Sequence, residues 1–146
     1  MDKKEVLLKE IDLIQSCINR MAQNSFVVKG WTISLVAVVL ALMPETISYK
    51  IVSSLGIIAT FCFWYLDAFF LKTERLYRWK YEWVITNRMQ SDEYLFNLNP
   101  KNSNMWPSDK KKEPTILRIM FTKTLVPIYL TLVILSMACL IFQILK

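Results

Sequence analysis

Residues 51–71 read IVSSLGIIATFCFWYLDAFFL, and this stretch decides the fold class. It is long enough to cross a bilayer as a helix, which takes about 20 predominantly apolar residues, and Asp67 is its only charged residue. Two further stretches, residues 26–43 and 124–145, are also long and apolar, although Lys29 lies near the start of the first. We therefore expect an all-α integral membrane helical bundle with three transmembrane helices.

The distribution of charge around these segments predicts their orientation. Residues 44–50 are only long enough for a tight hairpin, whereas residues 72–123 form a long polar connection to the third span. Of the 18 Lys and Arg residues, all except Lys50 and Lys146 then lie on the side of the N-terminus and residues 72–123. Because Lys and Arg favour cytoplasmic segments, we predict a multi-pass protein of the bacterial inner membrane with an N-in/C-out topology.

An amphipathic cytoplasmic helix is expected at residues 3–24. Its apolar residues recur at the heptad spacing of a helix–helix seam. This seam can pack on the protein's own helices, lie on the lipid surface or join copies of the chain. We predict that it is an oligomer seam. The seam residues are Leu7, Ile11, Ile14, Ile18 and Met21.

The segment after the second span is expected to continue as a helix into the cytoplasm. Residues 72–90 lack a helix breaker and are rich in the Trp, Tyr, Lys and Arg that the headgroup zone selects. The same mixture can bind a nucleotide or single-stranded nucleic acid, but an interfacial anchor requires the same residues and is favoured. Residues 91–115 are expected to form a cytoplasmic loop, in which the triplet 110–112 (KKK) favours anionic lipid.

A polar stripe follows one face of the second predicted helix. At about 100° per residue, its small and polar residues fall on one face and its bulky apolar residues on the other. A helix that faces lipid has no reason to gather polar residues in one line, so this face must point into protein or a water-filled path. The stripe residues, which are our candidates for lining a pore, are Ser53, Gly56, Thr60, Asp67, Glu74 and Arg78.

The first span carries a matching ridge of small residues. We expect this ridge to be the helix-packing face that meets the polar stripe, because small residues let helices approach closely. The ridge residues are Gly30, Ser34, Ala37 and Ala41.

Lys29 and Asp67 lie at similar depth when both are counted from the hairpin apex, near the predicted cytoplasmic boundary. A carboxylate inside a span is costly and normally has a partner. We therefore predict an intramembrane charge pair between Lys29 and Asp67, with a further hydrogen bond from Arg78 or Thr32. Asp67 can be a structural tie for the hairpin, part of an ion or proton path, or a side chain that snorkels to the interface.

The residue types present argue against catalysis. Histidine is absent, which removes the commonest general base and the commonest metal ligand. The sequence also lacks a Gly-rich phosphate loop, carboxylates that face a shared pocket and an activated-cysteine signature. We therefore predict no catalytic residues, no cofactor and no metal.

Two short motifs carry a resemblance to a known family. Residues 24–31 fit NSFxxKGW and residues 66–78 fit LDxxFLxxERLYR, which is similar to a widespread, largely uncharacterised family of small bacterial multi-span membrane proteins. The resemblance covers about residues 5–90 and the placing of the last span, and it implies no established activity. Proteins of this size and architecture look like the membrane-disrupting arm of anti-phage systems, an analogy that rests on architecture alone.

Two functions follow from these features. The first is a small homo-oligomeric effector that forms a pore or perturbs the membrane, which the polar stripe, the heptad seam and the missing catalytic set favour. The second is a membrane anchor or adaptor subunit whose cytoplasmic helices and 91–115 loop hold a soluble partner. The expected partners are thus the lipid bilayer, further copies of the chain and a soluble cytoplasmic protein. A transporter would need oligomerisation to enclose a path, since three spans show no internal repeat.

Overall fold

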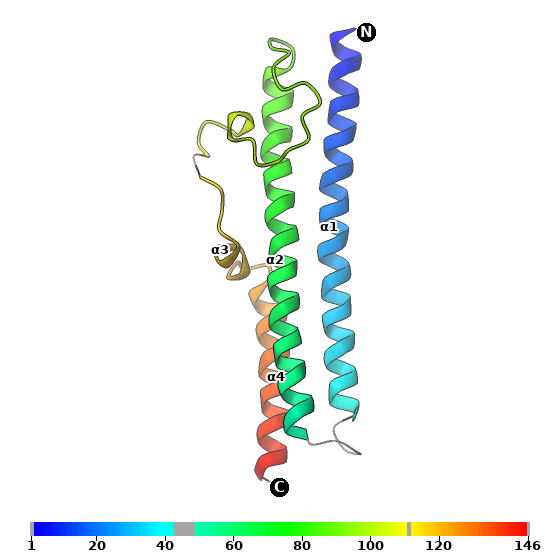
Figure 1. The fold of residues 1–146 in the computed structure, drawn as a ribbon, viewed down its shortest axis with the longest axis vertical. Helices are drawn as coiled ribbons and strands as arrows, with labels where there is room; N and C mark the ends of the chain where they lie inside the picture. Colours follow the sequence, from blue (N-terminus) through cyan, green and yellow to red (C-terminus); the bar gives the residue numbers. More distant parts are fainter. Residues whose placement is uncertain (1, 43–48, 111, 146) are drawn as a thin grey trace. The chain divides into compact units, whose positions relative to one another are not determined.

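The computed structural model describes residues 2–42, 49–110 and 112–145. These residues form the helices α1 (Lys3–Leu42), α2 (Tyr49–Asn87), α3 (Ile116–Met120) and α4 (Val126–Leu145), with one 3-10 turn, η1 (Ser103–Met105) (Figure 1). No strand occurs in these three ranges, so the prediction of an all-α chain is confirmed. The predicted hairpin turn at residues 44–50 lies mostly outside the described residues.

The two long helices follow from the absence of helix breakers. Neither α1 nor α2 contains a proline. Residues 3–24 and the first predicted span therefore form one continuous helix, and the second predicted span continues to Asn87. The predicted third span coincides with α4, in which Pro127 lies in the first turn, where a missing backbone N–H is tolerated.

Two of these helices are long and apolar enough to cross a membrane. They are α1 and α2, and Val126–Ala138 of α4 is a shorter apolar stretch among the described residues. The coarse prediction of long apolar helices is thus confirmed.

The chain divides into two compact units, to which α1 and α2 both contribute. Unit 1 contains Met1–Gln23 and Phe70–Thr115, and unit 2 contains Asn24–Phe69 and Ile116–Lys146. The boundary falls where the predicted cytoplasmic extensions leave the predicted spans.

Unit 1 is built on the heptad seam of α1. Ile14, Val84 and Met105 form its fully buried core. The other apolar side chains packed against them are Leu7, Ile11, Ile18, Tyr77, Tyr81, Trp83 and Leu98. The seam therefore packs within the chain on α2 and the 91–115 segment, which is the first of the three alternatives. That it also joins copies of the chain stays a prediction. Met21, at the end of the seam, is half-buried.

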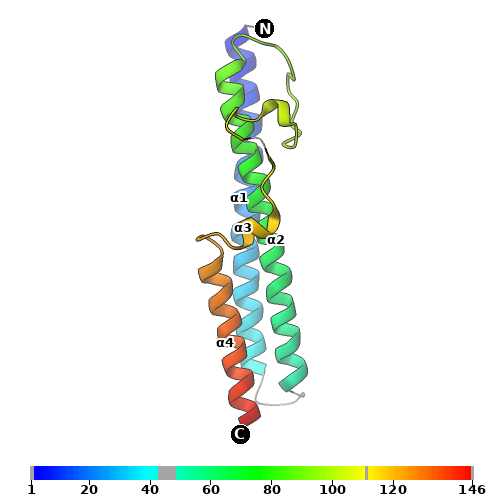
Figure 2. The same ribbon diagram turned by 90° about the vertical axis from the view of Figure 1, so that its left-hand side faces the viewer.

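Unit 2 contains the short helix α3 and a bundle of three longer helical segments: residues 24–42 of α1, residues 49–69 of α2, and α4 (Figure 2). α4 runs antiparallel to the α2 segment (Figure 1). Val36, Trp64 and Ala68 are among its buried apolar side chains.

The surface of unit 2 is apolar, whereas its interior holds polar side chains. Phe26, Trp31 and Leu55 are 75%, 65% and 61% exposed. Ser53, Thr60, Asp67 and other polar residues are instead fully buried. Large apolar side chains thus cover the surface, while buried polar side chains share the interior with apolar ones.

Candidate functional site

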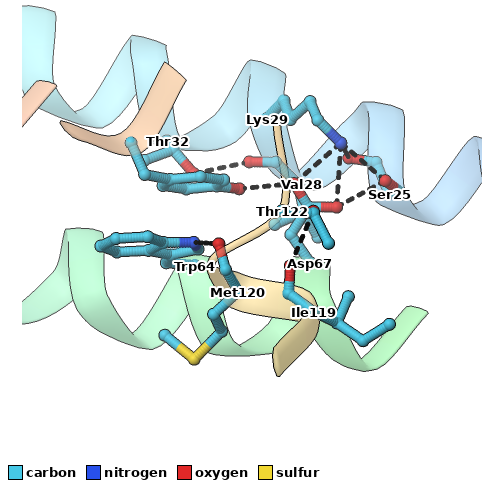
Figure 3. A network of polar contacts seen from close by, with 10 residues as sticks. Ser25, Val28, Lys29, Thr32, Trp64, Asp67, Ile119, Met120 and Thr122 are labelled. Atoms are coloured by element: carbon cyan, nitrogen blue, oxygen red, sulfur yellow. Dashed lines mark hydrogen bonds and ion pairs between the residues drawn. The ribbon is translucent and has the colours of Figure 1, made fainter. Parts of the chain in front are cut away.

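The carboxylate of Asp67 is the centre of a polar cluster that joins α1, α2 and α4 in unit 2 (Figure 3). Lys29 Nζ on α1 lies 2.8 Å from Asp67 Oδ2 and 2.9 Å from Oδ1. Ser25 Oγ, also on α1, donates to Oδ1 at 2.5 Å. From α4, the Tyr129 hydroxyl donates to Oδ2 at 2.9 Å. One carboxylate thus ties α2 to both of its neighbours.

The local sequence explains how α1 delivers two donors to one acceptor. Ser25 and Lys29 are four residues apart and therefore lie on the same face of the helix. Lys29 Nζ also donates to Ser25 Oγ at 2.7 Å, so the two side chains orient each other. The predicted charge pair between Lys29 and Asp67 is present, and depth counting was sufficient to find it.

The further donors that we expected for Asp67 are wrong. Arg78 pairs with Glu74 Oε1 at 2.7 Å, because it lies three helical turns beyond Asp67. The Thr32 hydroxyl donates instead to the carbonyl oxygen of Val28 at 2.7 Å. Ser25 and Tyr129 take these places, and sequence reasoning missed both.

The cluster satisfies the electrostatic demands of a buried carboxylate. Asp67 is fully buried, whereas the side chain of Lys29 keeps 19% of its surface exposed. The opposite charges cancel, and the two hydroxyl donors replace the water that the carboxylate loses on burial. The arrangement is stable as a neutral unit, and removing either charge leaves the other without its counter-ion.

An aromatic group positions Tyr129. The ring of Trp64 stacks on Tyr129 with centroids 5.6 Å apart and 3° between the planes. Trp64 Nε1 donates to the carbonyl oxygen of Met120 at 3.0 Å, and Phe121 meets the Trp64 ring edge-on. These contacts hold the end of α3 against α2, which fixes where α4 begins and places its first turn beside Asp67 (Figure 3).

The polar stripe of α2 is buried for most of its length. Ser53, Thr60 and Asp67 are fully buried in unit 2, and Gly56 is buried with them. Glu74, in unit 1, is buried, whereas its neighbour Arg78 is exposed. The stripe therefore faces protein, as predicted, except at Arg78. Whether it lines a pore stays a prediction.

The small-residue ridge of α1 does not form the packing face that we expected. Gly30, Ser34, Ala37 and Ala41 are all exposed, and a Cβ added to Gly30 would meet no atom within 4 Å. The face that packs on α2 and α4 lies on the opposite side of α1. It contains Ser25, Val28, Thr32 and Val36, all buried.

The ion pair and Gly56 explain this difference. Lys29 and Ser25 must turn toward Asp67, which directs the ridge outward. The close approach occurs at Gly56 of α2, where an added Cβ would lie 3.1 Å from Val39 Cγ1. α2, rather than α1, therefore supplies the small residue at the contact.

Unit 1 contains a second buried ion pair, which sequence reasoning also missed. Arg88 Nε and Nη2 donate to Glu10 at 2.5 and 2.8 Å, and both side chains are almost fully buried. Arg88 Nη1 also donates to the carbonyl oxygens of Ser91 and Glu93, at 3.0 and 2.7 Å. The sequence did hold a signal, since Glu10 lies three residues after Leu7 and four before Ile14, on the apolar seam itself.

A buried lysine holds the 91–115 segment from the same helix. Lys80 is 1% exposed, and its Nζ donates to the carbonyl oxygen of Asn99 at 3.1 Å. Burial lowers the pKa of Lys80 to about 8, although Glu10 and Cys17 oppose this shift and Arg88 adds to it.

The 91–115 segment is a loop, as predicted, but aromatic and ionic contacts attach it to α2. Trp106 meets Trp79 edge-on with centroids 5.6 Å apart, and Tyr94 meets Trp83 at 6.1 Å. Lys72 pairs with Glu113 at 2.8 Å.

The structure describes two of the three lysines in the basic triplet of this loop. Lys110 pairs with Asp109, and Lys112 is exposed. Lys111 lies outside the described residues. The preference of the triplet for anionic lipid stays a prediction.

Neither metal chemistry nor a known relative gives the cluster a role. Among the residues that the structure describes, no group of three or more Cys, Asp or Glu side chains is placed to hold a metal ion. Comparison with family models, curated proteins and solved structures finds no match. The family resemblance of residues 24–31 and 66–78 therefore stays a prediction, and function must be argued from the Asp67 cluster and the surface around it.

Proposed function

We propose that this chain is a three-span protein of the bacterial inner membrane, with its N-terminus in the cytoplasm. It acts as a homo-oligomeric effector that forms a pore or otherwise perturbs the membrane. The observation that carries the proposal is the polarity of unit 2, in which the fully buried Asp67 carboxylate lies inside an apolar surface.

Solvent preference supports the membrane part of this proposal. Phe26, Trp31 and Leu55 would each expose a large apolar side chain to water, at about 25 cal/mol per Å². In a bilayer the same side chains contact acyl chains. The buried hydroxyls and carboxylate are then shielded from lipid, which agrees with the rule that intramembrane ionisable groups face the bundle interior.

The buried stripe and the exposed ridge support the effector part. An intramembrane ionisable residue marks a functional site by default, and Asp67 is held by one partly exposed lysine and two hydroxyls. The ridge from Gly30 to Ala41 faces outward, and such ridges allow a second transmembrane helix to approach closely. Self-association through the ridge would not use the polar stripe, which each chain could then expose to form a pore.

Induced expression tests this function directly. We expect wild-type protein to depolarise bacterial cells, reported by a membrane-potential dye, and to give a multimeric native mass in detergent. Ala37→Leu, which fills the ridge, should reduce both the depolarisation and the multimer. The matched control is Ile33→Leu, a conservative change at another exposed position of α1. A monomer that accumulates without depolarising the cells would contradict the proposal.

A second candidate, the anchor or adaptor, is favoured by the tip of the 91–115 loop. Tyr94, Leu95 and Phe96 are exposed at this tip, and Tyr94 and Phe96 have φ angles of 55° and 52°. Positive φ at aromatic residues is strained, and such strain clusters at functional sites. Arg88 holds the tip in place through the Glu93 carbonyl oxygen.

Leu95→Asp separates the two candidates. In an adaptor, this change should release a stoichiometric soluble partner that co-purifies with the wild type, with no effect on membrane potential. In an effector, it should leave the depolarisation unchanged and no partner should be lost.

A further inference from the structure

Buried polar residues recur every seven positions on all three longer helical segments of unit 2. Each is at most 6% exposed. They are Ser25 and Thr32 on α1, Ser53, Thr60 and Asp67 on α2, and Tyr129 and Ser136 on α4. A seven-residue period keeps side chains on one face of packed helices, so the three sets point to a common axis.

Helix geometry arranges these residues in layers. Tyr129 meets Asp67, and α4 runs antiparallel to α2, so Ser136 lies at the level of Thr60, seven residues along each helix. On α1, Lys29 meets Asp67 and Val39 meets Gly56, which brings Thr32 within about one turn of that level. Ser53 forms the last described layer, about 10 Å beyond Thr60 at 1.5 Å per residue.

The hydroxyls in this column are buried and bonded mainly to their own helices. Thr32, Thr60 and Ser136 each donate their proton to a carbonyl oxygen on their own helix, at 2.7, 2.8 and 2.9 Å. A hydroxyl oxygen that donates its proton can still accept a hydrogen bond. Ser53 Oγ has no partner among the described residues although it is fully buried. A buried hydroxyl without a partner is a site at which an internal water is expected.

An apolar contact closes the column between two layers. Gly56 lies between Ser53 and Thr60 on α2, and the methyl groups of Val39 occupy the space that a Cβ on Gly56 would need, with 3.1 Å to the nearest. No hydrated ion fits through a contact of this kind, and an apolar constriction excludes water until it is widened.

We propose that this column is a proton path through a single chain, closed by Val39 at Gly56. The inference rests on the proposed membrane function, and it names the permeating species as protons, carried along hydroxyls and internal water. It makes Asp67 the proton-accepting group at one end of the path.

The transfer at Asp67 is balanced by one proton in and one proton out. A protonated water in the Thr60 layer gives its extra proton to an Asp67 carboxylate oxygen. One O–H bond breaks, which leaves a neutral water, one O–H bond forms on the carboxylate, and the ion pair with Lys29 is lost. The carboxylic acid then releases its proton to water on the side where Lys29 is partly exposed, and the ion pair forms again. The membrane potential drives the net movement, and no other reactant is required.

Vesicle assays with an opened and a matched variant test the path. Purified full-length protein is placed in phospholipid vesicles that contain a pH-sensitive dye, and valinomycin with a potassium gradient sets an inside-negative potential. Val39→Ser shortens the closing side chain and adds a hydroxyl. We expect it to acidify the vesicle lumen at least about tenfold faster than Val38→Ser, which equals ~1.4 kcal/mol of barrier. Val38 is its neighbour on α1 and is 55% exposed.

A second pair of variants tests whether the hydroxyl layer carries the protons. Adding Thr60→Val to Val39→Ser should return the acidification rate to near that of Val38→Ser. Adding Thr131→Val should leave it high, because Thr131 makes the same kind of bond to its own helix, to Pro127 O, but is exposed. If Val39→Ser fails to fold, as judged by elution and helix content, Val39→Ala replaces it, because it also shortens the closing side chain.

The outcomes separate the path from the effector function. Equal acidification by the Val39 and Val38 variants would overturn the path. Release of a large dye by Val39→Ser would overturn it as well, since that shows a wide pore. If either result came with depolarisation by wild-type protein in cells, the effector function would stand alone. Proton flux through Val39→Ser without wild-type depolarisation would leave the path standing and remove the effector.

Discussion

Asp67 accepts hydrogen bonds from Lys29, Ser25 and Tyr129, and these bonds make a carboxylate tolerable inside an apolar bundle. Each hydrogen bond to a charged group contributes about 1.5–3 kcal/mol. A carboxylate costs roughly 2.5–3.5 kcal/mol on insertion scales at the centre of a span, and less near the boundary where Asp67 is predicted to lie. The cluster therefore offsets this cost as a whole, and the loss of one donor should be measurable.

Removing the Tyr129 hydroxyl isolates one of these bonds. Tyr129→Phe keeps the ring that stacks on Trp64 and should lower the free energy of unfolding by about 1.5–3 kcal/mol. SDS-induced unfolding in mixed micelles, followed by tryptophan fluorescence, measures it. Tyr65→Phe, at a 52% exposed ring, should change it by less than about 0.5 kcal/mol. Equal losses in the two variants would show that the bond to Asp67 contributes little.

Lys80 in unit 1 gives stability a pH dependence with a defined sign. Its pKa is about 8 in the folded chain against an ordinary 10.5. Between these values the unfolded chain binds more protons, so stability rises with pH, by at most about 1.4 kcal/mol per pH unit. Burial raises the pKa of Tyr77 above its usual 10.0, which reverses the trend at higher pH.

Unfolding curves at several values between pH 8 and 10 test the sign. The wild type should become more stable across this window, whereas Lys80→Met should lose most of the slope. A wild-type stability that falls from pH 8 upward would mean that Lys80 keeps its proton when folded.

At the scale of the element, α1 presents different faces to different surroundings. In unit 1 its heptad seam packs on Val84 and Met105. In unit 2 its buried face is set by Ser25 and Lys29, and its small-residue ridge faces outward. One continuous helix thus combines an apolar seam with a polar one.

The seam should respond to truncation as an intrachain core does. Ile14→Ala should reduce stability by about 2–5 kcal/mol, because Ile14 is fully buried and leaves a cavity. Leu8 lies on the same helix and is 61% exposed, so Leu8→Ala should change the stability little. Thermal unfolding followed by circular dichroism compares them. A change in native mass with unchanged stability for Ile14→Ala would instead indicate an oligomer seam.

The loop depends on Arg88 as a planar donor. Arg88→Lys keeps the charge but cannot bond both oxygens of Glu10 and the carbonyl oxygens of Ser91 and Glu93. We expect trypsin to cleave after the exposed Lys101 several times faster, since cleavage follows the population of the opened loop. The control is Arg78→Lys, at an exposed arginine that pairs with Glu74. It should be cleaved as the wild type is, and identical rates in both variants would count against this role of Arg88.

At the scale of the whole chain, the sequence predicted those features that depend on the length and the twist of single helices. Span lengths predicted the long apolar helices, 100° spacing predicted the buried stripe, and depth counting predicted the ion pair between Lys29 and Asp67. These arguments need only the rise and twist of a helix.

Features that depend on two elements were out of reach of the same arguments. Glu10 and Arg88 are 78 residues apart, and Tyr129 is 62 residues from Asp67. The ridge was assigned to the wrong contact because size alone does not say which helix supplies the small residue. Gly56 of α2 supplies the small residue at this contact. The ion pair between Lys29 and Asp67 sets how α1 is turned, and this decides which helix supplies the small residue.

The central claim is that α2 hides a polar line inside unit 2 and turns its apolar side to lipid. Nitroxide labels placed singly at Ser53, Leu55, Ile58 and Thr60, with the protein in phospholipid vesicles, measure this directly. We predict frequent collisions with lipid-dissolved oxygen at positions 55 and 58, few at 53 and 60, and low collision with a water-soluble nickel complex at all four. High oxygen collision at 53 and 60, or high nickel collision at 55 and 58, would contradict the account.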